Sequence, residues 1–158
     1  MSFTVIIPTH DHSDTLQYSV GSVLAQTHQD FEIVIICDGS PPLTHEVAAA
    51  LSARDKRIRF VPFEKGERNG EAHRHKVMAG LSTDFVAYMA DDDVWFPNHL
   101  ECLAPVLTHS DIAHTMFMEM KPDGGVFTGV FDAAVEPDGV GRLRRLEAGF
   151  GLPSGDHR

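Results

Sequence analysis

Apolar runs alternate with helical segments over the first two thirds of the chain, and this alternation limits its fold more than any other feature. The runs Phe3–Ile7, Phe31–Cys37, Ile58–Phe63 and Asp84–Met89 are rich in β-branched and aromatic residues, so we predict strands there. Their apolar residues are continuous instead of alternating with polar ones, as in strands buried on both faces. With a helix between successive strands, the order βαβαβαβ predicts an α/β fold with a mostly parallel sheet and helices on both faces.

The helices are predicted from the spacing of apolar residues and from start signals. We expect Pro8 to end the first strand, followed by a helix carrying Leu16, Val20, Val23 and Leu24; a helix capped by Thr44 and ending near Ala53; a helix over Glu71–Ala79; and a helix from Pro97 to about Thr108.

Length and composition limit the class of protein. The 158 residues suffice for one domain, and the net charge of −10 argues against a nucleic-acid or anionic-membrane surface. Cys37 and Cys102 are far apart, and the sequence holds neither a signal peptide nor an apolar stretch long enough to cross a membrane. We therefore expect a cytoplasmic protein without a disulfide.

Three successive carboxylates, Asp91, Asp92 and Asp93, follow the last predicted strand directly. Because adjacent carboxylates repel one another and resist burial, such a run favours a hard divalent cation such as Mg²⁺ or Mn²⁺, which takes oxygen ligands. An acidic turn that caps the next helix is the alternative.

Polar residues follow all four predicted strands. Strand ends of a parallel sheet meet along one edge, where ligands of open α/β sheets bind. The segments that we expect along this edge are Pro8–Asp11, Asp38–Ser40, Lys65–Gly70 and Asp91–Asp93. Neither a Gly-x-Gly-x-x-Gly motif after the first strand nor a P-loop motif is present, which argues against a dinucleotide fold and a P-loop nucleotide site.

Five segments in order resemble the family 2 glycosyltransferases: Thr4–Thr9, Ser22–Thr27, Phe31–Ser40, Asn69–Arg74 and Asp91–Pro97. The resemblance implies a GT-A fold, whose Rossmann-like half binds a nucleotide-sugar, most often a UDP-sugar, with Mn²⁺ or Mg²⁺. It also implies transfer of the sugar with inversion to an acceptor, which could be a saccharide, a lipid or a small molecule.

The same resemblance implies roles for individual residues. Asp92 matches the second Asp of the family's Asp-x-Asp motif and is expected to bind the metal, with Asp91 facing the ribose or the metal. Ala90 stands where the motif has its first Asp, so Asp91 or Asp93 would have to substitute for it. Asp93 is equally compatible with a solvated loop or cap.

For the nucleotide, the resemblance assigns Asp38 to the base, together with Pro8, Thr9 and Asp11. An Asx-turn is the alternative for Asp38. Arg74 matches a helix Arg close to the diphosphate. Lys65, Arg68, Arg74 and Lys76 form a basic cluster in an acidic protein, so we expect it to face an anion, with a solvated surface as the alternative.

The C-terminal third carries weaker signals. We predict a β-hairpin of Ile112–Met120 and Val126–Phe131 that extends the sheet, and a short helical stretch with Arg142, Arg144 and Arg145. Residues 1–110 would then be the nucleotide-sugar-binding half and 111–158 a partial acceptor-side segment. No segment matches the family's catalytic base, so the chain looks shortened at its C-terminus. Glu119, Asp132 and Asp156 are carboxylates in this third of the chain, and none of the three stands in a motif.

Two other functions remain open. A non-catalytic nucleotide-sugar-binding module that acts with a partner chain would share the donor site without a base. A sugar nucleotidyltransferase would carry a Gly-rich, Arg-containing loop after the first strand, and Pro8–Asp11 does not supply one. The sequence is compatible with a homo-oligomer.

Overall fold

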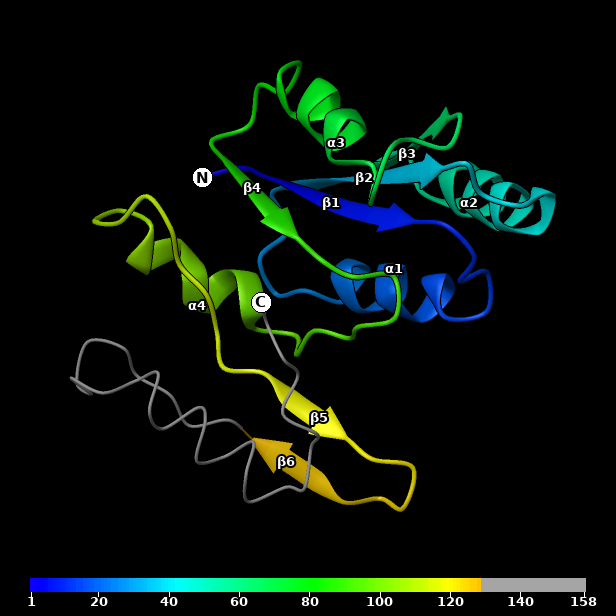
Figure 1. The fold of residues 1–158 in the computed structure, drawn as a ribbon. Coiled ribbons are helices and arrows are strands. Elements are labelled where there is room, and N and C mark those ends of the chain that lie inside the picture. Colours follow the sequence, from blue (N-terminus) through cyan, green and yellow to red (C-terminus); the bar gives the residue numbers. More distant parts are fainter. Residues whose placement is uncertain (129–158) are drawn as a thin grey trace, which may run out of the picture. The chain divides into compact units, whose positions relative to one another are not determined.

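A four-stranded parallel sheet forms the centre of the protein. The structure, a computed structural model, describes residues 1–128. The strands are β1 (Phe3–Thr9), β2 (Phe31–Asp38), β3 (Ile58–Phe63) and β4 (Phe85–Tyr88), and their spatial order is β3-β2-β1-β4 (Figure 1). The carboxyl ends of all four strands therefore lie along one edge of the sheet, as the sequence predicts.

Strand β1 runs through Pro8 to Thr9, so the prediction that Pro8 ends the strand is wrong. Pro8 pairs with Ile36 of β2, whereas β4 pairs with β1 only as far as Ile6. At Pro8 the strand thus has a neighbour on one side alone. Proline lacks an N–H to donate and is tolerated at such edge positions.

Helices cover both faces of the sheet, which confirms the α/β prediction. Residues of α1 (Leu16–Leu24), α2 (Pro42–Arg54) and α4 (His99–Val106) pack with the sheet in the larger apolar core. The smaller core on the opposite face contains Val77 of α3 (Glu71–Met78). In Figure 1, α3 accordingly lies on the opposite side of the sheet from α1 and α4.

The second helix begins earlier than predicted. Thr44 does not cap α2 but lies inside it and is buried, while Pro41 and Pro42 stand at the start. Because proline has a backbone φ that is already helical and needs no N–H donor in the first turn, it is favoured at the first helical position. Pro42 therefore overrides the start signal of Thr44. Similarly, α4 begins after Asn98, two residues past Pro97.

The burial of each strand follows its place in the sheet. Strands β1 and β2 are buried almost throughout, as their continuous apolar sequence predicts. In β4, an edge strand, Val86 and Tyr88 are exposed while Phe85 and Ala87 pack on the larger core. In β3, at the other edge, only Ile58 is buried, so continuous burial is wrong for both edge strands. Among the described residues, no helix has the length and apolarity needed to cross a membrane.

A second compact unit begins at His114, after the unit Met1–Ala113. It contains β5 (Met118–Met120) and β6 (Val126–Thr128), which pair antiparallel around a turn closed by Lys121 and Gly125. The predicted hairpin is therefore present but shorter. It forms a sheet of its own, so the prediction that it extends the main sheet is wrong. The predicted end of β6 at Phe131, the helical stretch with Arg142, Arg144 and Arg145, and the carboxylates Asp132 and Asp156 lie outside the described residues.

Candidate functional site

A cleft of about 200 Å³ opens at the carboxyl ends of the strands. Its walls come from the ends of β1, β2 and β4 and from the loop between β3 and α3. The lining residues are Pro8, Thr9, His10, His12, Asp38, Lys65, Asn69 and Asp91. Of the residues predicted to bind nucleotide, the structure thus brings together Pro8, Thr9, Asp38 and Asp91.

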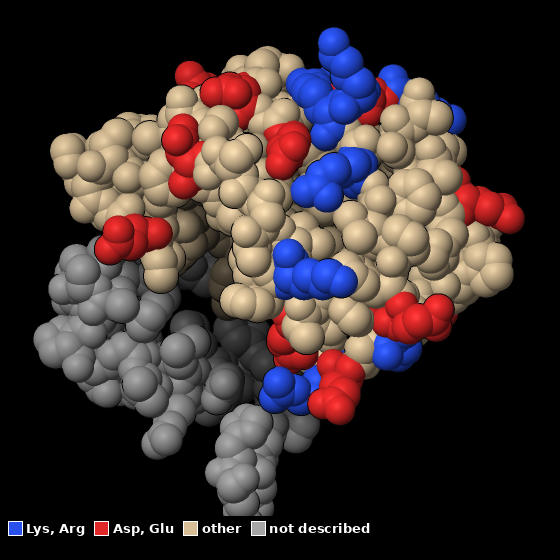
Figure 2. Space-filling view, turned by 90° about the horizontal axis from the view of Figure 1, so that it is seen from above, with Lys and Arg blue, Asp and Glu red and all other residues tan. Residues whose placement is uncertain are grey.

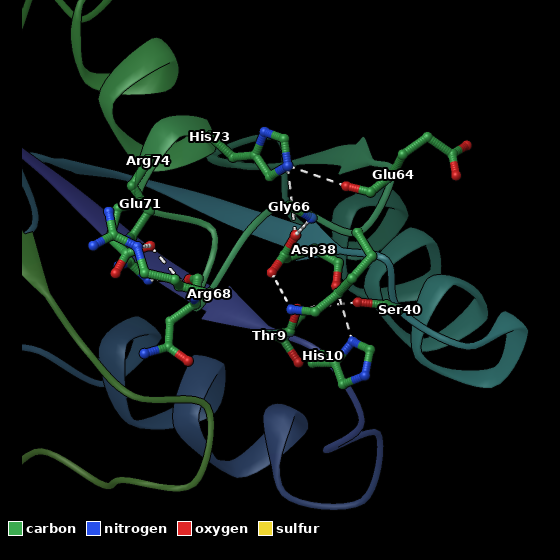
Figure 3. Close-up of polar contacts among 12 residues, drawn as sticks. Thr9, His10, Asp38, Ser40, Glu64, Gly66, Arg68, Glu71, His73 and Arg74 are labelled. Carbon is green, nitrogen blue, oxygen red and sulfur yellow. Dashed lines mark hydrogen bonds and ion pairs between the residues drawn. The ribbon is translucent and has the colours of Figure 1, made fainter.

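Asp38, the last residue of β2, is buried and accepts a hydrogen bond at each carboxylate oxygen. Its Oδ2 accepts a hydrogen bond from Lys65 Nζ at 2.5 Å, and its Oδ1 accepts one from the Gly66 amide at 2.6 Å. His73 Nε2 lies 3.5 Å from the same Oδ1, above the carboxylate in Figure 3. Burial acts to raise the pKa of Asp38, but the hydrogen bonds and the charge of Lys65 outweigh it, so the pKa lies below its ordinary value. Asp38 therefore presents a carboxylate to the cleft.

The end of β1 supplies a polar atom with no partner among residues 1–128. The Thr9 hydroxyl Oγ1 is buried and makes no hydrogen bond to any of these described residues, while the Thr9 backbone carbonyl accepts one from Ser40 Oγ at 3.0 Å. Next to it, His10 Nδ1 lies 2.8 Å from the carbonyl oxygen of Asp38 and ties the ends of β1 and β2 together (Figure 3). Because a buried polar group without a partner is costly, the Thr9 hydroxyl fits a site that is completed by a ligand.

Asp91 joins the acidic triplet to the loop after β1. It is buried, and its Oδ1 lies 2.9 Å from Nδ1 of the exposed His12. The hydrogen bond and the negative charge of Asp91 raise the pKa of His12. His12 is thus held toward the acidic side of the cleft, a contact that the sequence did not indicate.

The other two carboxylates of the triplet are exposed residues. The carboxyl group of Asp93 is nevertheless partly withdrawn from water, and this burial and the charges of Asp92 and Asp91 raise its pKa. Within residues 1–128, no group of three or more His, Cys, Asp or Glu side chains is placed to hold a metal ion. The donor set instead fits a Mg²⁺ or Mn²⁺ ion that takes one or two carboxylates and completes its shell with water and phosphate oxygens.

The four clustered cations all have partners within the protein. Lys65 pairs with Asp38, Arg68 lies 3.9 Å from Glu71, and Lys76 lies over the ring of Phe63. Arg74 Nη1 donates to the carbonyl oxygen of Asn69 at 2.8 Å, on the flank of Asp38 in Figure 3. Figure 2, which views the α3 side, shows Lys and Arg side chains with acidic ones among them. The cluster was expected to face an anion, and for Lys65 that anion is the carboxylate of Asp38 in the same protein.

Two of the residues predicted to bind the nucleotide lie outside the lining of the cleft, as do Asp92 and Asp93 of the predicted metal site. Asp11 is exposed in the loop after β1, and Arg74 is half-buried on α3. Conversely, sequence reasoning missed His10, His12 and His73. For His10 and His12 the signal was their place directly after the first predicted strand. Glu119 is exposed on β5, in the second unit.

The model of the family described as glycosyl transferase family 2 matches residues 4–127. An uncharacterized glycosyltransferase of Nostoc sp. is 36% identical over 118 residues, which are 73% of this chain and 36% of that protein. The Escherichia coli protein WfgD, named as a UDP-Glc:alpha-D-GlcNAc-diphosphoundecaprenol beta-1,3-glucosyltransferase, is 27% identical over 70% of this chain and 42% of its own length. The chain spans about a third of the Nostoc relative.

Solved structures show the same fold. Residues 1–349 of S. aureus TarS superpose with a TM-score of 0.61 at 20% identity, over 68% of this chain and 32% of that fragment. A Pyrobaculum calidifontis mannosyltransferase in complex with GDP-Man and Mn²⁺ gives a TM-score of 0.53 at 20% identity, over 62% of this chain and 30% of that one. The described sheet and helices are accordingly those of a GT-A fold. From the family match over most of its length, this chain belongs to glycosyl transferase family 2.

Proposed function

We propose that this chain is the donor-binding part of a glycosyltransferase that binds a UDP-sugar with a divalent metal and transfers the sugar with inversion. One observation carries the proposal: a single cleft joins the ends of β1, β2 and β4 through Thr9, Asp38 and Asp91. The E. coli relative is named for a UDP-Glc donor, and TarS has been solved in complex with UDP-GlcNAc, which supports the choice of nucleotide.

In this proposal the base lies between Pro8, Thr9 and Asp38. The buried carboxylate of Asp38 accepts a hydrogen bond from an N–H of the base, and the unpartnered Thr9 hydroxyl gains a partner on the nucleoside. Asp91, at the other end of the cleft, faces the ribose. Arg74 would reach the diphosphate only after leaving the Asn69 carbonyl.

Asp92 is the first candidate for the metal, with Asp91 and Asp93 beside it. A bound Mn²⁺ or Mg²⁺ would neutralise the charge that develops on the departing diphosphate. The chain's own part is to hold carboxylates at the end of β4. The raised pKa of Asp93 reflects, after burial, the mutual repulsion of these carboxylates, which a cation would relieve.

Calorimetric titration with UDP tests the proposal. UDP should bind more tightly with Mn²⁺ than without it, and Asp92→Ala should remove most of that enhancement because it deletes an oxygen ligand. Asp111→Ala, which removes an exposed carboxylate elsewhere in the first unit, serves as the control and should titrate like the parent. An Asp92→Ala protein with the parent's metal enhancement would contradict the assignment of the metal site.

Sugar transfer is measured separately, with labelled UDP-sugars and a panel of saccharide and lipid acceptors. The proposal expects release of UDP together with a product of inverted anomeric configuration. Binding of UDP-sugars without transfer or hydrolysis under any of these conditions would instead identify the chain as a nucleotide-sugar-binding module.

A further inference from the structure

His12, in the loop between β1 and α1, contacts the acidic triplet although the two are far apart in the sequence. Its Nδ1 lies 2.9 Å from Oδ1 of Asp91, and both residues line the cleft. The side chain of Asp91 is 10% exposed, whereas that of His12 is 54% exposed. Because an ionised carboxylate only accepts hydrogen bonds, Nδ1 carries the hydrogen and His12 is the donor. An exposed residue thus supplies the partner of a buried carboxylate.

Helix α1 fixes both sides of this contact. The carbonyl oxygen of His12 accepts a hydrogen bond from the amide of Leu16, the first residue of α1, at 3.0 Å. On the other side, Ser19 within α1 donates its hydroxyl to the carbonyl oxygen of Asp93 at 2.7 Å. The loop after β1 and the turn that carries the triplet are therefore anchored to the same helix, and the contact between His12 and Asp91 is built into the fold.

Asp91 differs from the other two carboxylates of the triplet in its surroundings. Asp92 and Asp93 are exposed and lie outside the lining of the cleft. Within residues 1–128, His12 is the only hydrogen-bond partner of the Asp91 carboxylate. Since a buried carboxylate without a partner is costly, loss of His12 would favour a rotation of Asp91 toward water.

The bond to His12 occupies Oδ1 and leaves Oδ2 as the oxygen with which Asp91 can meet a ligand. The base is proposed to lie between Pro8, Thr9 and Asp38. Asp91 lines the same cleft from the segment after β4. A ribose attached to the base presents two neighbouring hydroxyl groups, which donate hydrogen bonds, and a carboxylate binds the ribose in dinucleotide-binding α/β folds. The free oxygen of Asp91 therefore suits the ribose hydroxyls.

From this geometry, and resting on the nucleotide site proposed above, we infer that His12 is a positioning residue, which holds Asp91 so that Oδ2 accepts hydrogen bonds from the ribose hydroxyls. His12 acts through Asp91 and does not itself bind the nucleotide. A group that is held in place before binding loses less conformational freedom when the ligand arrives. The role requires an N–H at the position of Nδ1, which distinguishes it from a side chain that only fills space.

The test compares UDP with 2′,3′-dideoxy-UDP, which lacks both ribose hydroxyls, by calorimetry in Mn²⁺ buffer at constant pH. His12→Ala should weaken UDP binding about tenfold, the factor that corresponds to one lost hydrogen bond to a charged group. Binding of the dideoxy nucleotide should change little, because Asp91 has no hydroxyl to accept from in that ligand.

His12→Asn and His12→Gln form a matched pair of variants. The amide nitrogen of Asn stands as many bonds from the backbone as Nδ1 of His, whereas that of Gln stands one bond further away. His12→Asn should therefore restore most of the UDP affinity, and His12→Gln should resemble His12→Ala. If His12→Ala does not fold, the comparison of Asn with Gln decides.

His109→Ala is the control, because it removes an exposed histidine after α4 that does not line the cleft. It should bind both nucleotides like the parent, and circular dichroism should show which variants are folded. Unchanged UDP affinity in folded His12→Ala, equal losses for UDP and the dideoxy nucleotide, or equal affinities of the Asn and Gln variants overturn the inference while the proposed function stands. A parent chain that binds neither nucleotide overturns the proposed function itself.

Discussion

The carboxylate of Asp38 contacts three residues of the cleft region at once: Lys65, Gly66 and His73. Its position at the last residue of β2, a strand buried almost throughout, fixes where the carboxylate stands. A nucleobase N–H would therefore meet an acceptor that needs little rearrangement.

Asp38→Ala should weaken UDP binding about tenfold to a hundredfold, since loss of a buried hydrogen-bond partner costs about 1–3 kcal/mol. The enhancement by Mn²⁺ should persist, because the acidic triplet is intact. Asp55→Ala is a fitting control: Arg57 holds the pKa of Asp55 at about 2, yet this ion pair lies before β3 and away from the cleft. Equal UDP affinity in Asp38→Ala and the parent would exclude the assignment of Asp38 to the base.

At the scale of elements, helix α1 holds the segment between the triplet and α4. Gln26, two residues past the end of α1, is buried, and it donates to the Phe96 carbonyl at 2.8 Å and accepts from the Leu100 amide at 3.0 Å. Leu100 lies in the first turn of α4, whose amides have no partner within the helix. The Gln26 side chain thus provides hydrogen-bond partners for a carbonyl of the loop before α4 and for an amide in the first turn of α4.

Gln26→Ala should lower the free energy of unfolding by about 1–3 kcal/mol, because it leaves the buried Leu100 amide without that partner. The Phe96 carbonyl still accepts a hydrogen bond from the His99 amide at 3.0 Å. Urea denaturation followed by circular dichroism measures the change. Gln17→Ala on α1 removes an exposed glutamine and should stay within about 0.5 kcal/mol of the parent. Similar stabilities for the two variants would show that Gln26 does not support α4.

Gly70 starts α3 with a left-handed backbone, at a φ of 70°. Gly70→Ala should cost about 1–2 kcal/mol for that conformation alone, and UDP binding should weaken because the new Cβ would press on Asp38. Gly21→Ala within α1, where a Cβ meets nothing within 4 Å, should instead stabilise the protein by about 0.5–1 kcal/mol. Thermal unfolding and UDP titration of both variants check this. A Gly70→Ala protein that keeps parental affinity would count against the tight packing around Asp38.

Prediction from sequence succeeded where short-range patterns decide the structure. Strand β3 was predicted to the residue, because Ile58–Phe63 is apolar except for Arg59 and is bounded by polar segments. Prediction failed at the start of α2, where Thr44 and Pro42 both signal the beginning of a helix. It also failed at Pro8, because the end of β1 depends on which neighbouring strands pair with it. The pairing of Lys65 with Asp38 depends on how a loop folds back on another strand, and neither residue type nor spacing indicates it.

At the scale of the whole molecule, pH acts through groups that folding moves away from their ordinary pKa. Burial lowers the pKa of His99, which stacks on Trp95 at 4.1 Å, so the folded protein binds fewer protons than the unfolded chain just below pH 6.5. The free energy of unfolding should therefore rise with pH through that interval. His12 has a raised pKa, and its contribution is present below pH 6.5 and lost as pH rises through the folded value.

His99→Phe keeps a ring beside Trp95 and isolates the first effect. The stability of the parent minus that of His99→Phe should increase from pH 5 to pH 7, and the contribution of His12 cancels in the difference. Trp95 is the single tryptophan of the chain, so its fluorescence can report on His99 in the same samples. A difference that does not depend on pH would show that His99 titrates alike in the folded and unfolded states.

Because β1 and β2 are buried, their amide hydrogens should exchange with deuterium later than those of the loops around the cleft. Each of these strands has a strand on both sides and apolar cores on both faces, so its amide hydrogens should exchange last, through opening of the whole sheet. Thr9 and Asp38 end these strands, whereas residues 64–70 and 91–97 lie in loops that should label early. Nucleotide would then add protection to those loops and leave β1 and β2 unchanged. The base would thus bind to the ends of β1 and β2, which are rigid before binding. The phosphates would order the loops that they contact.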